Sequence, residues 1–191
     1  MDLRTPLDER TVRSLHVGDL VTVSGTVVTG RDEMHLRTLE TLRAGDAVPM
    51  DLSGAALYHC GPIVSGDRLV AAGPTTSARM DSIEAEFIAR TGVRAIIGKG
   101  GMSHEVSEAM REHGCVYLAA TGGAAVSLAR DVEVKGVHWM DLGMPEAMWV
   151  LETDRMGPLV VAMDSHGESL YEGVRDEVAR NMPRARSILG L

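Results

Sequence analysis

Aromatic residues, lysine and cysteine are all scarce in this sequence of 191 residues. It contains one Phe, two Trp and three Tyr, so we expect some of its 12 Met residues to fill core space that aromatic rings would otherwise occupy. Lys99 and Lys135 are its only lysines, and arginine carries the rest of the positive charge. With a net charge of -8, the chain is not expected to present a surface for nucleic acid or acidic membranes.

Cysteine is limited to Cys60 and Cys115. A disulfide framework is not expected from two cysteines in a chain of this size. A cubane iron-sulfur cluster normally takes three or four cysteine ligands, so this chain cannot hold one by itself. No apolar run approaches the roughly 20 residues of a membrane span, and the amino terminus MDLRTPLDER lacks the apolar core of a signal peptide. We therefore expect a cytoplasmic protein without a membrane segment.

Length and composition predict one globular domain over residues 1–191, with 45% hydrophobic and 24% charged residues. The tail at 173–191 is polar and arginine-rich. We expect this tail to be helical, with Pro183 interrupting it.

The middle of the chain predicts alternating strands and helices. Leu69–Ala72 and Ala95–Ile97 have the length and composition of buried parallel strands, and Met80, Ile83 and Phe87 recur at helical spacing between them. Comparable units follow, with a helix at 103–113, a strand at 116–119 and a helix at 124–130. Units of this kind predict parallel strands joined by right-handed crossovers, with the intervening loops on one edge of the sheet.

A second set of segments predicts a β layer. Asp19–Thr29 shows the clearest alternating pattern, and shorter β-like runs follow at 134–139, 148–152 and 159–163. We assign the sequence to the α/β class, as parallel strand-loop-helix units with an additional β layer, a domain of the swivelling β/β/α type.

Two glycine-containing loops lie where a predicted strand gives way to a helix. In the first, Thr75, Thr76 and Ser77 precede a helix whose first turn offers unpaired N–H groups to an anion, and Arg79 lies in that turn. In the second, Lys99 is the cation among glycines. These groups could surround one small anionic ligand.

The second loop, Gly98–Gly101, does not match the nucleotide-binding motifs. The dinucleotide fingerprint needs glycine where Ser103 stands, and a phosphate loop needs Ser or Thr where Gly100 stands. An anion cradle and a simple tight turn both remain open for this loop. Arg31, at another strand-to-helix junction, is on pattern alone a solvated residue of a first helical turn.

Metal and hydrolase sites find little support in the sequence. His104, Glu105 and His113 form no His-x-x-x-His pair, and Asp164 and His166 fall on a predicted turn, so we expect no metal bound by this chain alone. No Gly-x-Ser-x-Gly elbow of a serine hydrolase occurs.

Six blocks of sequence resemble the signature blocks of one enzyme family. They are TGRDEMH (29–35), YHCGPIV (58–64), GPTTSARM (73–80), GKGGM (98–102), LGMPEAMW (142–149) and GPLVVAMDSHG (157–167). The family is the β subunit, or carboxy-terminal domain, of class I iron-sulfur fumarases and L-tartrate dehydratases. The blocks keep the family's order and cover most of the chain.

This resemblance implies a mechanism and roles for particular residues. A [4Fe-4S] cluster in a partner α subunit would act as Lewis acid on the hydroxyl that leaves malate or adds to fumarate. By matching motifs, Thr75 corresponds to the proposed catalytic base, and Arg31, Arg79 and Lys99 correspond to residues that bind substrate carboxylates. Thr76, Ser77 and Gly100 lie in the same matching loops and are expected to bind substrate.

The resemblance therefore implies the β subunit of a two-subunit fumarate hydratase, active only in a hetero-oligomer with a fumarase-type α subunit. L-tartrate dehydratase, which shares the same blocks, is the alternative in substrate. A non-catalytic anion-binding scaffold domain is the alternative from another functional class.

Overall fold

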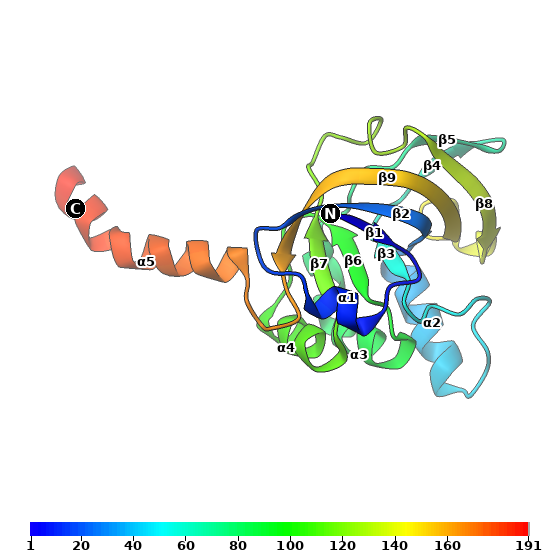
Figure 1. Cartoon of the computed structure of the whole chain (residues 1–191), viewed down its shortest axis with the longest axis horizontal. Helices are drawn as coiled ribbons and strands as arrows, with labels where there is room; N and C mark the ends of the chain where they lie inside the picture. The colour runs from blue at the N-terminus through cyan, green and yellow to red at the C-terminus, as the bar shows by residue number, and fades with distance from the viewer. Residues whose placement is uncertain (191) are drawn as a thin grey trace.

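The centre of the structure, a computed structural model that describes residues 1–190, is a run of parallel strands. In spatial order they are β1 (Asp2–Arg4), β2 (Leu20–Thr29), β3 (Ala56–Tyr58), β6 (Ala95–Gly98) and β7 (Val116–Ala119). The long strand β9 (Met148–Met163) runs antiparallel to both β7 and β2, so the pairings close into a ring. Figure 1 shows β9 arching with β2 over the short strands β3, β6 and β7.

Further antiparallel strands extend the sheet beyond β9. β8 (Val132–His138) pairs with β9, β5 (Arg68–Ala71) pairs with β8, and β4 (Ile63–Ser65) forms a hairpin with β5. Together with β9 and β2 they form the β layer that the sequence predicts.

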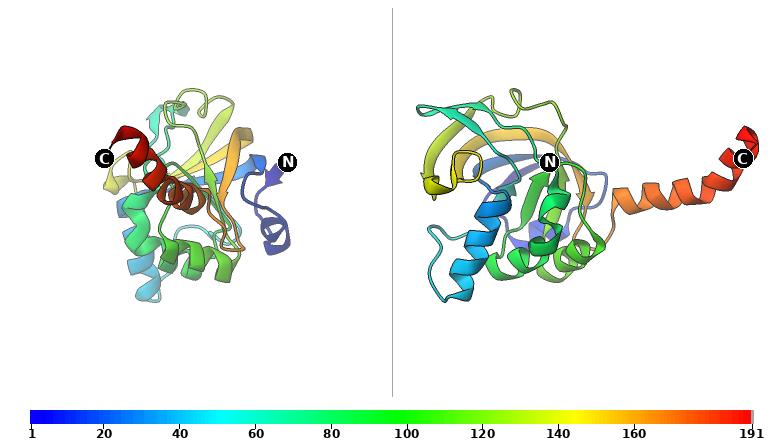
Figure 2. Two further views of the ribbon diagram at one scale, coloured as in Figure 1. Left: turned by 90° about the vertical axis from the view of Figure 1, so that its left-hand side faces the viewer. Right: turned by 180° about the vertical axis from the view of Figure 1, so that it is seen from behind.

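Helices cover the other face of the short parallel strands. They are α2 (Asp32–Arg43), α3 (Asp81–Thr91) and α4 (His104–His113), and both views in Figure 2 place them below the sheet. Two short 3-10 turns, η1 (Ser77–Met80) and η2 (Met140–Leu142), and the short helix α1 (Glu9–Arg13) complete the body. The mixed α/β class that the sequence predicts is confirmed.

The side chains of the short parallel strands alternate between the two faces of the sheet and so contribute to two hydrophobic cores. Ala56 and Tyr58 face the β layer, whereas Leu57 between them faces the helices. Ile96 and Tyr117 likewise point toward the helices and pack with Phe87. Successive side chains of a strand point to opposite faces, so a strand covered on both sides is apolar throughout. The result is a helix layer, a middle layer and an outer β layer.

Three predictions about individual segments are wrong. The strand at 69–72 is not parallel: β5 pairs antiparallel with β8 and with the edge strand β4, and in it Leu69 is buried but Val70 is 43% exposed. The expected helix at 124–130 is a series of turns with one helical hydrogen bond, from Leu128 N–H to the Ala124 carbonyl. The runs at 148–152 and 159–163 belong to the single strand β9, since the residues between them also pair with β2.

The carboxy-terminal helix α5 (Leu170–Leu189) projects away from the body (Figure 1). The helical prediction for the tail is confirmed up to Leu189, although Pro183 lies within the helix and does not end it. None of its residues is buried. Residue 191 lies outside the described residues.

Candidate active site

The two glycine-containing loops and the end of β3 are joined by backbone hydrogen bonds. Thr75 N–H donates to the carbonyl of His59 at 2.7 Å, and Lys99 N–H donates to the carbonyl of Thr75 at 3.3 Å. Ser77 N–H in turn donates to the carbonyl of Lys99 at 3.0 Å. The carboxyl ends of β3 and β6 therefore fix the backbone of Thr75.

Exposure differs among the predicted site residues of these loops. Thr75 is partly exposed, and Thr76 and Gly100 are exposed. Within residues 1–190 the Thr75 hydroxyl takes part in no hydrogen bond. A cleft of about 370 Å³ opens beside the loops, with Gly100 and Ala78 in its lining. The backbone is thus held while the Thr75 hydroxyl remains available.

The predicted cations come from three elements at this same edge. Arg31 is the N-cap residue of α2, and its guanidinium lies 3.2 Å from the Glu146 carboxylate. Arg79 in η1 forms an ion pair of 2.9 Å with Asp32, which ties η1 to the start of α2. In the part of the chain that the structure describes, the Lys99 amine makes no ion pair. The structure therefore brings all three predicted cations to one edge, and leaves Lys99 open to an anion.

Ser77 lies deeper than the other predicted site residues, because it is fully buried. Its Oγ lies 2.9 Å from Nδ1 of His59 and 2.9 Å from the hydroxyl of Tyr117. The structure therefore indicates that Ser77 supports the loop from beneath, with its hydroxyl turned away from the surface.

The side chains of His59, Glu84 and His35 form a buried ionisable cluster that extends from Ser77 toward α2 and α3. Nε2 of His59 lies 3.2 Å from Oε2 of Glu84, and Nε2 of His35 lies 3.4 Å from the same oxygen. Nδ1 of His35 lies 2.7 Å from the backbone carbonyl of Arg31. All three side chains are fully buried. The two Glu84 contacts are close enough for ion pairing, although neither is aligned as a hydrogen bond.

The charges of this cluster depend on one another. Burial would raise the pKa of Glu84, but the adjacent His59 and His35 outweigh burial and hold that pKa at about 2. Burial would lower the pKa of His35, but the Glu84 carboxylate raises it above its ordinary value. For His59 burial prevails, and its pKa is lowered. These directions favour an ionised Glu84, a protonated His35 and a neutral His59, an arrangement that has no net charge.

A sequence model described as Fumarase C-terminus matches residues 1–174 of the chain. The L(+)-tartrate dehydratase subunit beta of Escherichia coli is 43% identical over 173 residues, which are 88% of this chain and 85% of that protein. A Methanocaldococcus jannaschii protein provisionally named as the same subunit is 48% identical over 90% of this chain and 91% of its own length. A Geobacillus stearothermophilus protein provisionally named class I fumarate hydratase is 44% identical over 90% of this chain, and the match covers 34% of that longer protein.

This chain belongs to the class I fumarase and tartrate dehydratase family, as its β component. The two enzyme names are those of hydro-lyases, so the chain is part of a hydro-lyase. Its resemblance in sequence to this family is confirmed.

The cysteines of this family member do not suit an iron-sulfur cluster. Cys60 and Cys115 are both buried, and they lie in different cores on opposite faces of the middle layer. Burial raises the pKa of the Cys60 thiol to about 12 and raises that of Cys115 as well, which disfavours the thiolates that ligate iron. The residues of this chain therefore do not fit the [4Fe-4S] group.

The buried cluster is the part of the site that sequence reasoning missed. His35 and His59 lie in two of the signature blocks, but Glu84 looked like an ordinary polar residue of a helix. Its burial between two histidines could be found only from the packing of α2 and α3. The three side chains also offer ligand types for a metal, with one ligand atom each within 4.8 Å of the others.

Helices in the described region, residues 1–190, do not combine the length and apolar character needed to cross a bilayer.

Proposed function

We propose that this chain is the β subunit of a two-subunit class I fumarate hydratase, which hydrates fumarate reversibly to (S)-malate. The observation that carries the proposal is the convergence of Thr75, Arg31, Arg79 and Lys99 on one edge of the sheet, with the Thr75 hydroxyl and the Lys99 amine available. The same proposal includes the finer fold assignment, a swivelling β/β/α-type domain.

The three cations serve to bind the substrate carboxylates. Arginine offers a bidentate fork to a carboxylate and lysine a compact charge, so together they can hold both ends of a four-carbon diacid. In the structure, Arg31 pairs with Glu146 and Arg79 pairs with Asp32. A dicarboxylate competes with these two side chains for the guanidinium groups. Thr76 and Gly100, both exposed beside Lys99, complete the contact surface.

Thr75 is the proposed proton-transferring group. Removal of a proton beside a carboxylate creates a dianionic aci-carboxylate, and fixed cations stabilise that species more than they stabilise the ground state. A threonine hydroxyl is a weak base by itself. Because no group within residues 1–190 accepts a hydrogen bond from it, we assign the acceptor that activates Thr75 to the partner subunit.

The proposed partner is a fumarase-type α subunit, in a hetero-oligomer. We assign the [4Fe-4S] cluster to that subunit, where an iron free of cysteine supplies the Lewis acid for the substrate hydroxyl. This chain then contributes the carboxylate-binding residues and Thr75. We also propose a cytoplasmic location, where the two free thiols stay reduced.

L-tartrate dehydration to oxaloacetate is the second candidate. It is supported by the relatives of similar length, which are named as tartrate dehydratase subunits. Fumarate and tartrate chemistry share the elimination of water next to a carboxylate, and a few pocket contacts are sufficient to select between diacids that differ in hydroxyl groups.

The test is to purify the tagged chain with its co-purifying partner in the absence of oxygen, and to assay fumarate hydration and L-tartrate dehydration in parallel. Fumarate turnover by an iron-containing complex would support the proposal, and turnover of tartrate alone would replace the substrate. An inactive complex, with malate binding unaffected by Arg79→Ala, would favour a non-catalytic scaffold. The isolated chain is expected to be inactive, and turnover without a cluster would contradict this division of roles.

A further inference from the structure

The buried cluster connects two loops that carry the proposed substrate contacts. At one end His35 contacts the carbonyl of Arg31, and at the other end His59 contacts the hydroxyl of Ser77. Glu84 of α3 lies between the two imidazoles. The cluster thus bridges the start of α2, the end of β3 and the Gly-Pro-Thr-Thr-Ser loop, beneath the surface where substrate would bind.

The neighbours of each ring nitrogen define where the protons lie. Nδ1 of His35 faces a carbonyl and its Nε2 faces a carboxylate, and both neighbours are acceptors, so His35 carries a proton on each nitrogen. Nε2 of His59 also faces the Glu84 carboxylate and carries a proton. A second proton on His59 would leave a net positive charge in the core, which is costly.

A single proton pattern then follows for the rest of the network. With Nδ1 of His59 unprotonated, the Ser77 hydroxyl must donate to it. The Ser77 oxygen is then free to accept from the Tyr117 hydroxyl, which lies 2.9 Å away. The hydroxyl protons of Ser77 and Tyr117 each have one acceptor in this arrangement, so it holds Ser77 in one orientation.

Backbone hydrogen bonds connect Ser77 to the residues that are proposed to act on substrate. Its backbone N–H donates to the carbonyl of Lys99, and Lys99 N–H donates to the carbonyl of Thr75. His59 supports Thr75 directly as well, because its own carbonyl accepts the Thr75 N–H at 2.7 Å. His59 therefore acts on the loop through both its backbone and its side chain.

We propose that His35, Glu84, His59 and Tyr117 are positioning residues that hold Thr75 and Lys99 in place for catalysis through Ser77, with His35 doubly protonated and His59 protonated on Nε2 alone. The positioning role rests on the proposed function, whereas the proton arrangement can be tested without it. A hydroxyl displaced by about 1 Å can lower a rate by about 100-fold, so loss of the Ser77 contact should reduce kcat more than it raises KM.

The kinetic test uses Ser77→Ala in the assembled complex. We expect kcat to fall about 10- to 100-fold while KM changes less than threefold. Ser107→Ala is the matched control, because Ser107 is equally buried but its Oγ has no partner, and its kcat should stay unchanged. Tyr117→Phe keeps the ring and removes the hydroxyl, and should lower kcat in the same direction. Unchanged kcat in both Ser77→Ala and Tyr117→Phe, with an active wild-type complex, would overturn the positioning role.

The proton arrangement is tested by long-range ¹H–¹⁵N spectra of the histidine rings in the labelled full chain. We expect one buried histidine with both nitrogens protonated and one with a proton on Nε2 alone, and Ser77→Ala should shift Nδ1 of the second. A proton on Nδ1 of His59, a neutral His35, or a stoichiometric divalent metal in the purified chain would overturn the arrangement. If the complex turns over neither substrate while these spectra are as expected, the proposed function fails and the buried proton arrangement stands.

Discussion

Gly98 leaves the space that the hydroxyl of Ser77 occupies: a Cβ added at Gly98 would overlap Ser77 Oγ and would lie 2.9 Å from the Tyr117 hydroxyl. The φ angle of Gly98 is not in the left-handed region, so space alone explains the glycine at this position. The hydroxyls of Ser77 and Tyr117 therefore leave room only for glycine at the end of β6.

Gly98→Ala should disturb the network without any backbone strain. We expect the free energy of unfolding to fall by about 1–3 kcal/mol, as for other overpacked sites. Chemical denaturation of the purified chain measures this change. Gly136→Ala is the control, since an added Cβ at Gly136 in β8 meets nothing within 4 Å.

Ser77→Ala combined with Gly98→Ala should cost less than the sum of the two single changes, because the first removes the atom with which the new Cβ collides. Strict additivity of the two free energies would show that Gly98 and Ser77 are not coupled.

Glu84→Gln should destabilise the chain at neutral pH by about 3–5 kcal/mol, because it leaves a buried cation without its partner. Since the folded pKa of Glu84, about 2, lies below its ordinary value of 4.5, its ionised form contributes stability above pH 4.5 that is lost as the pH falls toward 2.

The difference in unfolding free energy between wild type and Glu84→Gln should therefore shrink as the pH is lowered from 4.5 to 2, when it is followed by denaturant titration at a series of pH values. Glu86→Gln on the exposed face of α3 serves as the control for the general effect of acid, because its carboxylate pairs at the surface with Arg43 and Arg90. A difference that stays constant over this range would show that Glu84 is not ionised in the fold.

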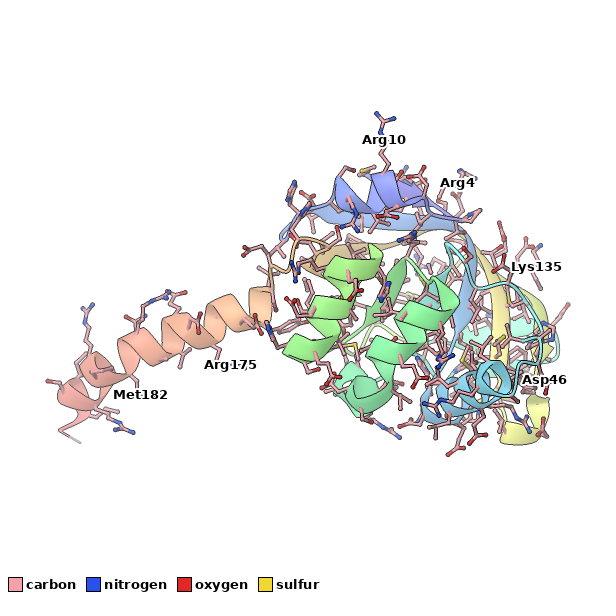
Figure 3. All side chains as sticks on the ribbon, turned by 90° about the horizontal axis from the view of Figure 1, so that it is seen from below. Arg4, Arg10, Asp46, Lys135, Arg175 and Met182 are labelled. Carbon is pink, nitrogen blue, oxygen red and sulfur yellow. The ribbon has the colours of Figure 1, made fainter. Side chains whose placement is uncertain are left out.

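Lys99→Ala should reduce the stabilisation of the transition state more than Lys135→Ala does. Loss of a charge-assisted contact costs about 1.5–3 kcal/mol, so kcat/KM of the complex should fall about 10- to 100-fold. Lys135 is the natural control: it lies on β8, where it pairs with Glu133 at the surface, and Figure 3 shows it at the edge of the molecule. Equal kcat/KM values for Lys99→Ala and Lys135→Ala would show that Lys99 is not part of the substrate site.

Ending the chain after Arg175 should leave the body intact. Figure 3 shows Arg175 and Met182 on α5, which extends clear of the body, and none of the helix is buried. We expect the melting temperature to change by less than about 2 °C. Tyr171→Ala provides the contrast, because the Tyr171 ring packs against Gly101 and beside Tyr117, and its loss should lower the melting temperature. A large drop on truncation would mean that the distal helix supports the fold.

Local patterns were sufficient for most of the elements. The spacing of apolar residues predicts the strands β3, β6 and β7 and the helix α3. The positions of the glycines predict the loops between them. The errors fall where partners lie far away in the chain. β5 has the composition of a buried parallel strand but pairs antiparallel beside the edge strand β4, and the two runs of β9 are joined because Thr153 and Met156 pair with β2.

The family, the α/β class and the loops that carry Thr75, Arg79 and Lys99 follow from the amino-acid sequence, because signature blocks and glycine loops are local features. Only the tertiary structure brought Arg31 and Arg79 to one edge and enclosed Glu84 between His35 and His59. That enclosure depends on how α2 and α3 pack on the sheet, and burial, which makes these charges interdependent, is a property of the packed layers and not of any one segment.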